Sequence, residues 1–353
     1  MKQCIKALVM AFTLLASIDS GSQQTADPQA WEREEAWRAS ASVNSRMEAD
    51  QLQEFLRTGD DAGSLRLIRE ITLNERWPAP ARERVIYEYV SALRKEPPSA
   101  VGHEVIDFLK GFQSTVWVPH DDHPHASVPL FNIKGAATGV VNEWSRQEAA
   151  FEGATLVATD PAHLVLAYQQ EQDAPRKRGL LDSLDTASRL QLAAVSQAVL
   201  PEISRHPELI AVAHRAAINS KDISALTELA ENGRGAEMHR VFRDSAVLFD
   251  IPQTQHLLEA ALRNPSYETA ALAIAQFALV LGGNEATEHL LIQLLDDPQL
   301  GSSAALALAA KPSATALHSL ELLADSGKNE LFATRARLAL KIHASGMTGQ
   351  MHK

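Results

Sequence analysis

Cysteine is nearly absent from this chain of 353 residues, which holds only Cys4. Cys4 lies in an N-terminal segment that we expect to be removed, so the mature protein would contain no cysteine. Such a chain can form no disulfide, no cysteine-based zinc site and no cysteine nucleophile. Its stability must come from burial of an ordinary core over roughly 330 residues, a length that is ample for independent folding.

Aromatic residues and basic residues are also scarce. Aromatics make up 5% of the chain, and 33 Lys and Arg stand against 44 Asp and Glu, for a net charge of −11. Few aromatics and few β-branched runs argue against an all-β fold. An acidic chain is unsuited to binding nucleic acid, because affinity for phosphate comes from a basic surface. An apolar content of 45% predicts a folded chain rather than a disordered one.

The first 22 residues have the order of a secretory signal peptide. Lys2 and Lys6 precede the apolar run Ala7–Ala16, and small and polar residues follow up to Ser22. The run is too short to span a bilayer, which needs about 20 apolar residues, and no later run approaches that length. The alternative is a buried N-terminal helix. We expect export, and a soluble periplasmic or secreted protein after cleavage.

The remaining chain predicts helix after helix. Apolar residues recur at spacings of three and four, and prolines fall between such segments rather than inside them. Helices joined by short turns leave no room for a sheet. We expect an N-terminal helical region over residues 23–113, a loop rich in His, Asp and Pro over 114–130, a helical-repeat region over 131–345, and a polar C-terminal tail over 346–353.

The last third of the chain repeats itself. Units that begin at Ser224, His256, His289 and His318 are 32, 33 and 29 residues apart and align without a gap over ten positions. Their third positions are Leu226, Leu258, Leu291 and Leu320, and their last positions are Gly233, Pro265, Pro298 and Gly327. Each unit predicts a helix, a turn and a second helix, and stacked copies can bury apolar faces that one pair cannot. The alternative is a compact all-α domain.

The second helices of these units share a pattern of alanine and leucine. The three matching segments are Ala270–Ile274, Ala304–Leu308 and Ala336–Leu340. Alanine is expected to let neighbouring helices approach, with leucine filling the remaining space. The histidines that open three of the units, His256, His289 and His318, are expected at the solvent edge.

Residues 224–344 resemble the HEAT-repeat family of helical-hairpin arrays, most closely over Phe332–Leu340 with its basic residue and stripe of small residues. The resemblance implies an all-α fold, an α-solenoid of stacked hairpins like those of HEAT and armadillo proteins, that offers surfaces to other proteins. The family's turn Asp occurs at Asp297 and its basic residue at Arg335. Neither occurs in every unit, and the units are shorter than a typical HEAT repeat.

Residues 114–130 form the one long connection without a helical pattern, and such loops in compact domains are often functional. Imidazole and carboxylate groups gather in it, and both are good ligands for zinc and similar ions. The candidate metal ligands are His120, Asp121, Asp122, His123 and His125. The spacing matches no strong metal signature, so a protein contact or an inert loop are the other interpretations. The candidate residues for a protein contact are Trp117, His120, His123 and His125.

The sequence offers no recognisable enzyme signature: it has no GxSxG, P-loop, GxGxxG after a strand, or HExxH. We therefore expect no catalytic residue and no cofactor other than a possible divalent metal. The favoured function is an exported scaffold that binds another periplasmic or envelope protein. The alternatives are a metal-binding protein or metal-dependent hydrolase using His120 to His125, and a chaperone-like binder using an apolar face of the repeats.

Overall fold

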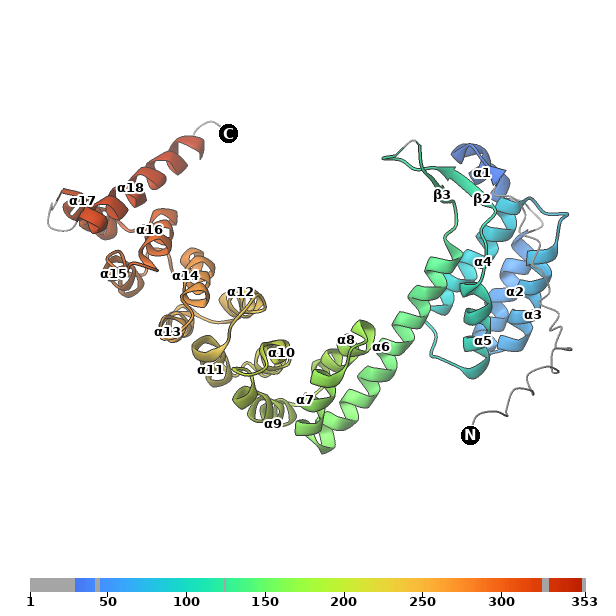
Figure 1. Cartoon of the computed structure of the whole chain (residues 1–353), viewed down its shortest axis with the longest axis horizontal. Coiled ribbons are helices and arrows are strands. Elements are labelled where there is room, and N and C mark those ends of the chain that lie inside the picture. Colours follow the sequence, from blue (N-terminus) through green and yellow to red (C-terminus); the bar gives the residue numbers. More distant parts are fainter. Residues whose placement is uncertain (1–28, 42–44, 124, 326–329, 351–353) are drawn as a thin grey trace, which may run out of the picture. The chain divides into compact units, whose positions relative to one another are not determined.

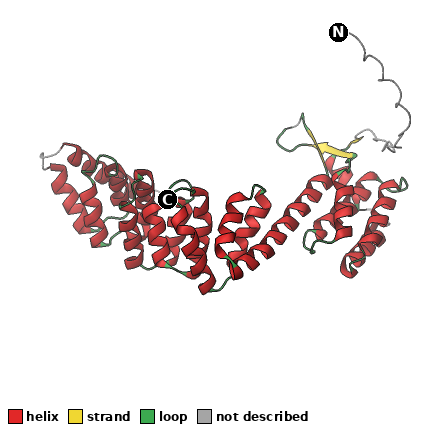
Figure 2. Ribbon diagram, turned by 60° about the horizontal axis from the view of Figure 1, so that its bottom comes forward, coloured by secondary structure: helices red, strands yellow, loops and turns green. Residues whose placement is uncertain are grey.

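The computed structural model of the protein describes residues 29–41, 45–123, 125–325 and 330–350. This part of the chain holds 18 α-helices (Figure 1), and strand is confined to one small sheet (Figure 2). The expected all-α class is thus confirmed. The chain divides into two compact units, residues 1–140 and 141–353. The expected signal peptide, residues 1–22, lies outside the described part.

The first unit holds five complete helices, the sheet and the start of a sixth helix. The helices are α1 (Arg33–Ser40), α2 (Ser45–Thr58), α3 (Asp61–Leu73), α4 (Ala79–Leu93), α5 (Ala100–Lys110) and the beginning of α6 (Ile133–Thr159). Ser99 and Asp60 cap α5 and α3 with their side chains, which satisfies N–H groups that a helix leaves free at its first turn. α4 packs against α1, α2 and α3, and it also contacts the sheet.

The sheet corrects the expectation that the helices leave no room for one. Its strands are β1 (Gln29–Ala30), β2 (Val116–Pro119) and β3 (Ser127–Pro129), in the order β1-β2-β3. β1 runs parallel to β2, and β2 pairs antiparallel with β3, with Val118 opposite Val128. The segment 114–130, expected as a loop, is therefore mostly a β-hairpin. Two short strands escape sequence analysis easily, because four residues of alternating burial carry little periodic signal.

The second unit holds the rest of α6 and twelve further helices. These are α7 (Pro161–Gln170), α8 (Ala174–Asp182), α9 (Arg189–Val199), α10 (Ile210–Ser220), α11 (Ile223–Asn232), α12 (Met238–Leu248), α13 (Ile251–Leu262), α14 (Tyr267–Leu281), α15 (Glu285–Leu294), α16 (Gly301–Ala310), α17 (Ala314–Asp325) and α18 (Glu330–Gln350), with 3₁₀ turns η1 (Ser183–Asp185), η2 (Leu200–Glu202) and η3 (Pro207–Leu209). α18 continues into the segment 346–353 expected as a tail. Among the described residues of either unit, no helix is long and apolar enough to cross a membrane.

The aligned repeat positions fall on equivalent elements. The four units begin on α11, α13, α15 and α17, and each is followed by a second helix, α12, α14, α16 or α18. The leucines at the third position are all buried, from 0% exposed at Leu226 to 4% at Leu291. The second helices pack side by side in the order α12, α14, α16, α18. Figure 1 shows them on one side of the row and the first helices on the other.

The shared alanine–leucine pattern of the second helices has a different meaning from the one expected. Its alanines are buried, with Ala270, Ala304 and Ala336 at most 1% exposed. The middle leucine points outward instead of filling the core, because it lies on the opposite side of the helix. Leu306 is 55% exposed and Leu338 is 39% exposed, and the equivalent Leu272 is half-buried. The repeated middle leucine therefore belongs to the surface of the second helices and not to the core.

Two buried polar side chains fasten one repeat to the one before it. The Asn264 amide donates to the backbone carbonyls of Ala230 (2.8 Å) and Gly233 (2.9 Å) at the end of α11. Arg335 of α18 donates to the carbonyls of Leu295 (2.8 Å), Asp297 (2.7 Å) and Pro298 (3.2 Å) in the turn after α15. These bonds satisfy carbonyls that a helix end leaves unpaired. The basic residue of the HEAT-like segment therefore acts within the fold.

The repeat register can be tested with two leucines of one unit. We expect Leu291→Ala to lower the free energy of unfolding by about 2–5 kcal/mol, because it empties a buried site. Leu306→Ala, at an exposed position, should change it by less than about 0.5 kcal/mol. Leu294, one turn further along α15, is half-buried and should give an intermediate loss. Urea unfolding followed by circular dichroism measures all three, and equal losses at Leu291 and Leu306 would contradict the register.

Candidate functional site

The hairpin β2–β3 is fixed at its base by a buried carboxylate. Glu83 of α4 is 2% exposed, and its Oε1 accepts from the Thr115 N–H (2.6 Å), the Thr115 hydroxyl (2.9 Å) and the Val116 N–H (3.2 Å). Val116 and Val118 are buried beside it in a small core with Ala36 of α1. The hairpin is therefore part of the fold rather than a free loop.

The environment of Glu83 favours its protonated form. Burial raises the pKa of this carboxyl from 4.5 to about 7, although the bonds from Thr115 and Val116 and the nearby charge of Arg82 act against the rise. The second oxygen, Oε2, is buried and accepts no hydrogen bond from the described residues. A proton on Oε2 would remove the charge and leave the three bonds to Oε1 intact.

Because the pKa is raised by folding, Glu83 should make stability depend on pH. The folded protein binds more protons at this site than the unfolded one between about pH 4.5 and 7, so the contribution is complete below this range and is lost as pH rises through it. The total is on the order of 3 kcal/mol. We expect Glu83→Gln, which keeps an acceptor and removes the charge, to gain on wild type as pH rises from 4.5 to 7.5. Urea unfolding at several pH values measures the free energy of unfolding of both proteins. If this free energy depended on pH in the same way for wild type and Glu83→Gln, the prediction would be wrong.

The tip of the hairpin projects its polar side chains into solvent. Asp121, Asp122, His123 and His125 are exposed, and His120 is half-buried. Backbone bonds close the tip, from His120 N–H to the Ala126 carbonyl (2.9 Å) and from Ala126 N–H to the His123 carbonyl (2.8 Å). Arg33 of α1 holds it from the side, donating to the Pro119 carbonyl (2.7 Å) and pairing with Asp121 (3.0 Å). The described residues of the tip are thus held at its base and at its side.

The candidate metal ligands are only partly brought together. The rings of His120 and His123 lie 5.1 Å apart, and Nδ1 of His120 accepts from the Asp122 N–H at 3.1 Å. Asp121 is turned toward Arg33. Among the described residues, no group of three or more His, Cys, Asp and Glu is arranged to hold a metal ion. A metal site here stays a prediction, and it would need side chains that lie apart to converge.

The free edge of the hairpin is poorly suited to pairing with another strand. The bonds from His120 to Ala126 and from Leu130 to Val116 (3.0 Å) show that alternate residues of β3 face β2. Ser127 and Pro129 therefore direct their backbone groups toward the open edge, and proline has no N–H to donate. A short edge that carries proline resists strand addition. A partner would contact the tip through side chains.

Trp117 contributes less to an open surface than expected. Its side chain is half-buried, and its indole N–H donates to the Ser114 carbonyl at 2.9 Å. Its backbone carbonyl accepts from Trp31, which joins β1 to the hairpin. Its role as a contact residue stays a prediction, and its packing role is visible in the structure. The histidines His256, His289 and His318 are exposed, as predicted.

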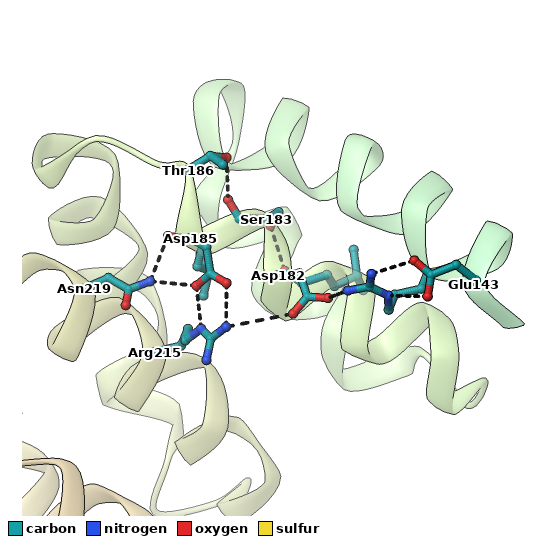
Figure 3. A network of polar contacts seen from close by, with 10 residues as sticks. Glu143, Asp182, Ser183, Asp185, Thr186, Arg215 and Asn219 are labelled. Atoms are coloured by element: carbon teal, nitrogen blue, oxygen red, sulfur yellow. Dashed lines mark hydrogen bonds and ion pairs between the residues drawn. The ribbon is translucent and has the colours of Figure 1, made fainter. Parts of the chain in front are cut away.

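A second polar cluster lies in the unit of residues 141–353, where a chain of alternating charges joins α6, α8, η1 and α10 (Figure 3). Arg146 binds Glu143 (2.6 Å) and Asp182, and Arg215 binds Asp185 (2.5 Å) and lies 3.9 Å from Asp182. Burial alone would raise the pKa of Asp185, but bonds from Arg215 and Asn219 lower it overall. Each carboxylate has a basic partner, so the cluster joins these helices by ion pairs.

The charges of the four repeats are divided between the two layers of helices. α11, α13, α15 and α17 carry seven Asp and Glu and no Lys or Arg. α12, α14, α16 and α18 carry five Lys and Arg against three Asp and Glu. Most of the exposed leucines lie on the second layer, namely Leu279, Leu306, Leu331 and Leu338, whereas the first layer exposes Leu322. The two sides of the repeat region therefore differ in charge and in apolar character.

Comparison with known proteins gives no relative: no family model, no curated protein and no solved structure matches the chain. The HEAT-like interpretation thus rests on the repeat pattern and on the packing of hairpins. Sequence reasoning missed Glu83 and Arg33, because nothing in their spacing connects them to residues 32 and 88 positions away. The available signal for Glu83 was its position on the face of a predicted helix whose other residues are buried.

Proposed function

We propose that the protein is an exported helical-repeat scaffold, a HEAT-like α-solenoid, that binds another protein of the periplasm or cell envelope. The observation that carries the proposal is the hairpin tip, which is exposed to solvent but fixed at its base by Glu83 and at its side by Arg33. A contact surface that is already ordered loses less entropy on binding than a free loop does.

Other features support a scaffold rather than an enzyme. The acid–base cluster of Figure 3 pairs its carboxylates with arginines, and the bonds from Arg215 and Asn219 lower the pKa of Asp185. Glu83, whose pKa is raised, is buried beneath the hairpin. A repeat body that exposes most of its surface leucines on one side is typical of proteins that act through extended surfaces.

The alternative is a metal-dependent role for the tip. The facing rings of His120 and His123 favour it, since two imidazoles 5.1 Å apart could share an ion after small rotations. Metal analysis of the purified protein, with and without His120→Ala and His123→Ala, separates the two functions. Stoichiometric zinc or a similar ion that disappears in the variants supports the metal role, and its absence supports the scaffold.

The contact itself can be tested by exchanging only the tip. Residues 120–126 are replaced with glycine and serine, which keeps Val116, Val118 and Ser127 in place. We expect a protein that co-purifies with the wild type from the cells that express it to be lost with this variant, while the helical content stays the same. Replacing residues 94–98, a turn on the same unit, is the matched control. Equal recovery from the tip variant and wild type would contradict the proposal.

Export makes a separate prediction. Mass spectrometry of the protein from its own cells should find a new N-terminus between residues 17 and 23, because signal peptidase cuts after small residues that follow the apolar run. The periplasmic or culture-fluid fraction should contain this shortened form. A protein that begins at Met1 and stays in the cytoplasmic fraction would contradict export, and would leave the fold and the surfaces unaffected.

A further inference from the structure

The second helices of the repeats present an apolar strip with basic borders. Its centre is formed by α14 and α16, where Leu279 is 71% exposed and Leu306 is 55% exposed. Because α12 and α18 are the next helices on either side, Arg240 and Arg243 border the strip at one edge and Arg337 and Lys341 at the other. We call this surface, from α12 to α18, the second-helix face.

The two borders differ in how their charges are satisfied. Arg243 pairs with Asp244 at 2.9 Å and Arg240 with Glu237 at 3.5 Å. Arg337 instead donates to the Ala324 carbonyl (3.1 Å) and the Thr334 hydroxyl (3.3 Å), and neither Arg337 nor Lys341 has an ion pair among the described residues. Beside exposed Leu338, α18 therefore carries two positive charges that no carboxylate of the described residues pairs with.

We propose that the second-helix face binds an amphipathic, acidic segment of another protein. Its apolar side chains would cover Leu279 and Leu306, and its carboxylates would lie over Arg337 and Lys341. Charge complementarity argues for this occupant, since unpaired cations beside an apolar strip favour a ligand with acids beside apolar residues. The inference concerns a surface separate from the hairpin tip.

Other occupants fit the face less well. Anchoring to an anionic membrane takes about four to eight clustered basic residues, and here two of the four border arginines and lysines are already paired with carboxylates. A second copy of this chain could offer its acidic first helices, but those helices expose few apolar side chains, chiefly Ile251 and Leu322. Both occupants are distinguishable in the experiment below.

A photoreactive phenylalanine analogue at Leu306 tests the proposal in the cells that express the full-length protein. The matched control places the analogue at His289, which is exposed on α15, the first helix of the same repeat. We expect an adduct from Leu306 and none from His289, and sequencing of the crosslinked peptide should find apolar residues together with several Asp or Glu. Two charge reversals, Arg337→Glu with Lys341→Glu, should reduce the adduct about tenfold.

Circular dichroism and thermal melting of the charge-reversed protein show whether it is folded, since both side chains are exposed. If it is not, Lys341→Glu alone should give the same direction of change. An adduct with lipid, with a second copy of the chain or with a segment that lacks Asp and Glu would overturn the proposal. The absence of any adduct from Leu306 would overturn it too. If Leu306 gives no adduct but a partner that depends on the hairpin tip is found, this inference alone is overturned. If neither the adduct nor that partner is found, the proposed function is overturned as well.

Discussion

Arg335→Ala is expected to lower the free energy of unfolding by about 3 kcal/mol. Arg335 is 8% exposed, and its guanidinium donates to three carbonyls of the turn after α15. Removing it leaves these acceptors with no partner from the protein, and each bond to a charged donor contributes about 1.5–3 kcal/mol. Arg335→Lys should recover only part of the loss, because one ammonium cannot reach three carbonyls as the planar fork does.

Two further variants make this result specific. Arg337→Ala, on the same helix but exposed, removes an equal charge and should cost less than about 1 kcal/mol. Gly301→Ala should damage the same contact from the other side, because a methyl group at Gly301 would collide with the Arg335 guanidinium and with the Leu295 carbonyl. Urea unfolding measures all four proteins. A loss at Arg335 no larger than that at Arg337 would mean that the bonds between repeats add nothing to stability.

Phe277→Ala should have an equal or larger effect, with a loss of about 3–5 kcal/mol. Phe277 of α14 is fully buried, and its ring packs edge-to-face on Phe242 of α12 with centroids 5.4 Å apart. Truncation removes the contact between two successive second helices and leaves a cavity behind. The effect should therefore weaken the attachment of neighbouring hairpins and not only one helix.

The control lies two residues further on the same helix. Leu279 is 71% exposed, so Leu279→Ala should change stability by less than about 0.5 kcal/mol although it removes three carbon atoms. Thermal melting and urea unfolding of the two variants provide the comparison. Similar losses for both, or a small loss at Phe277, would contradict the side-by-side packing of α12 and α14.

The helical class and the repeat register could be predicted from sequence because both depend on the spacing of apolar residues along the chain. Buried leucines at Leu226, Leu258, Leu291 and Leu320 follow directly from the aligned units. The outward direction of Leu306 and Leu338 could not be predicted, since an alanine-rich helix offers two apolar sides and only its neighbours decide which is covered. The sheet was missed because β1 and β2 are separated by 85 residues that include α1 to α5, and each strand is very short.

The candidate site was predicted in part. The composition of residues 120–125 indicated an unusual surface segment, and the structure exposes Asp121, Asp122, His123 and His125 at the tip of the hairpin. Its supports were not predictable, because Glu83 and Arg33 reach it from helices distant in the sequence. The second-helix face was equally hidden, as its cations on α12 and α18 become neighbours of one apolar strip only when the hairpins pack.

The central claim is that the hairpin tip contacts another protein, and crosslinking from the tip measures this most directly. A photoreactive analogue at His123, in the full-length protein within its own cells, is compared with the same analogue at Glu104, which is exposed on α5 of the same unit. The account predicts a discrete protein adduct from His123 and none from Glu104. No protein adduct from His123, or equal adducts from both positions, would contradict it.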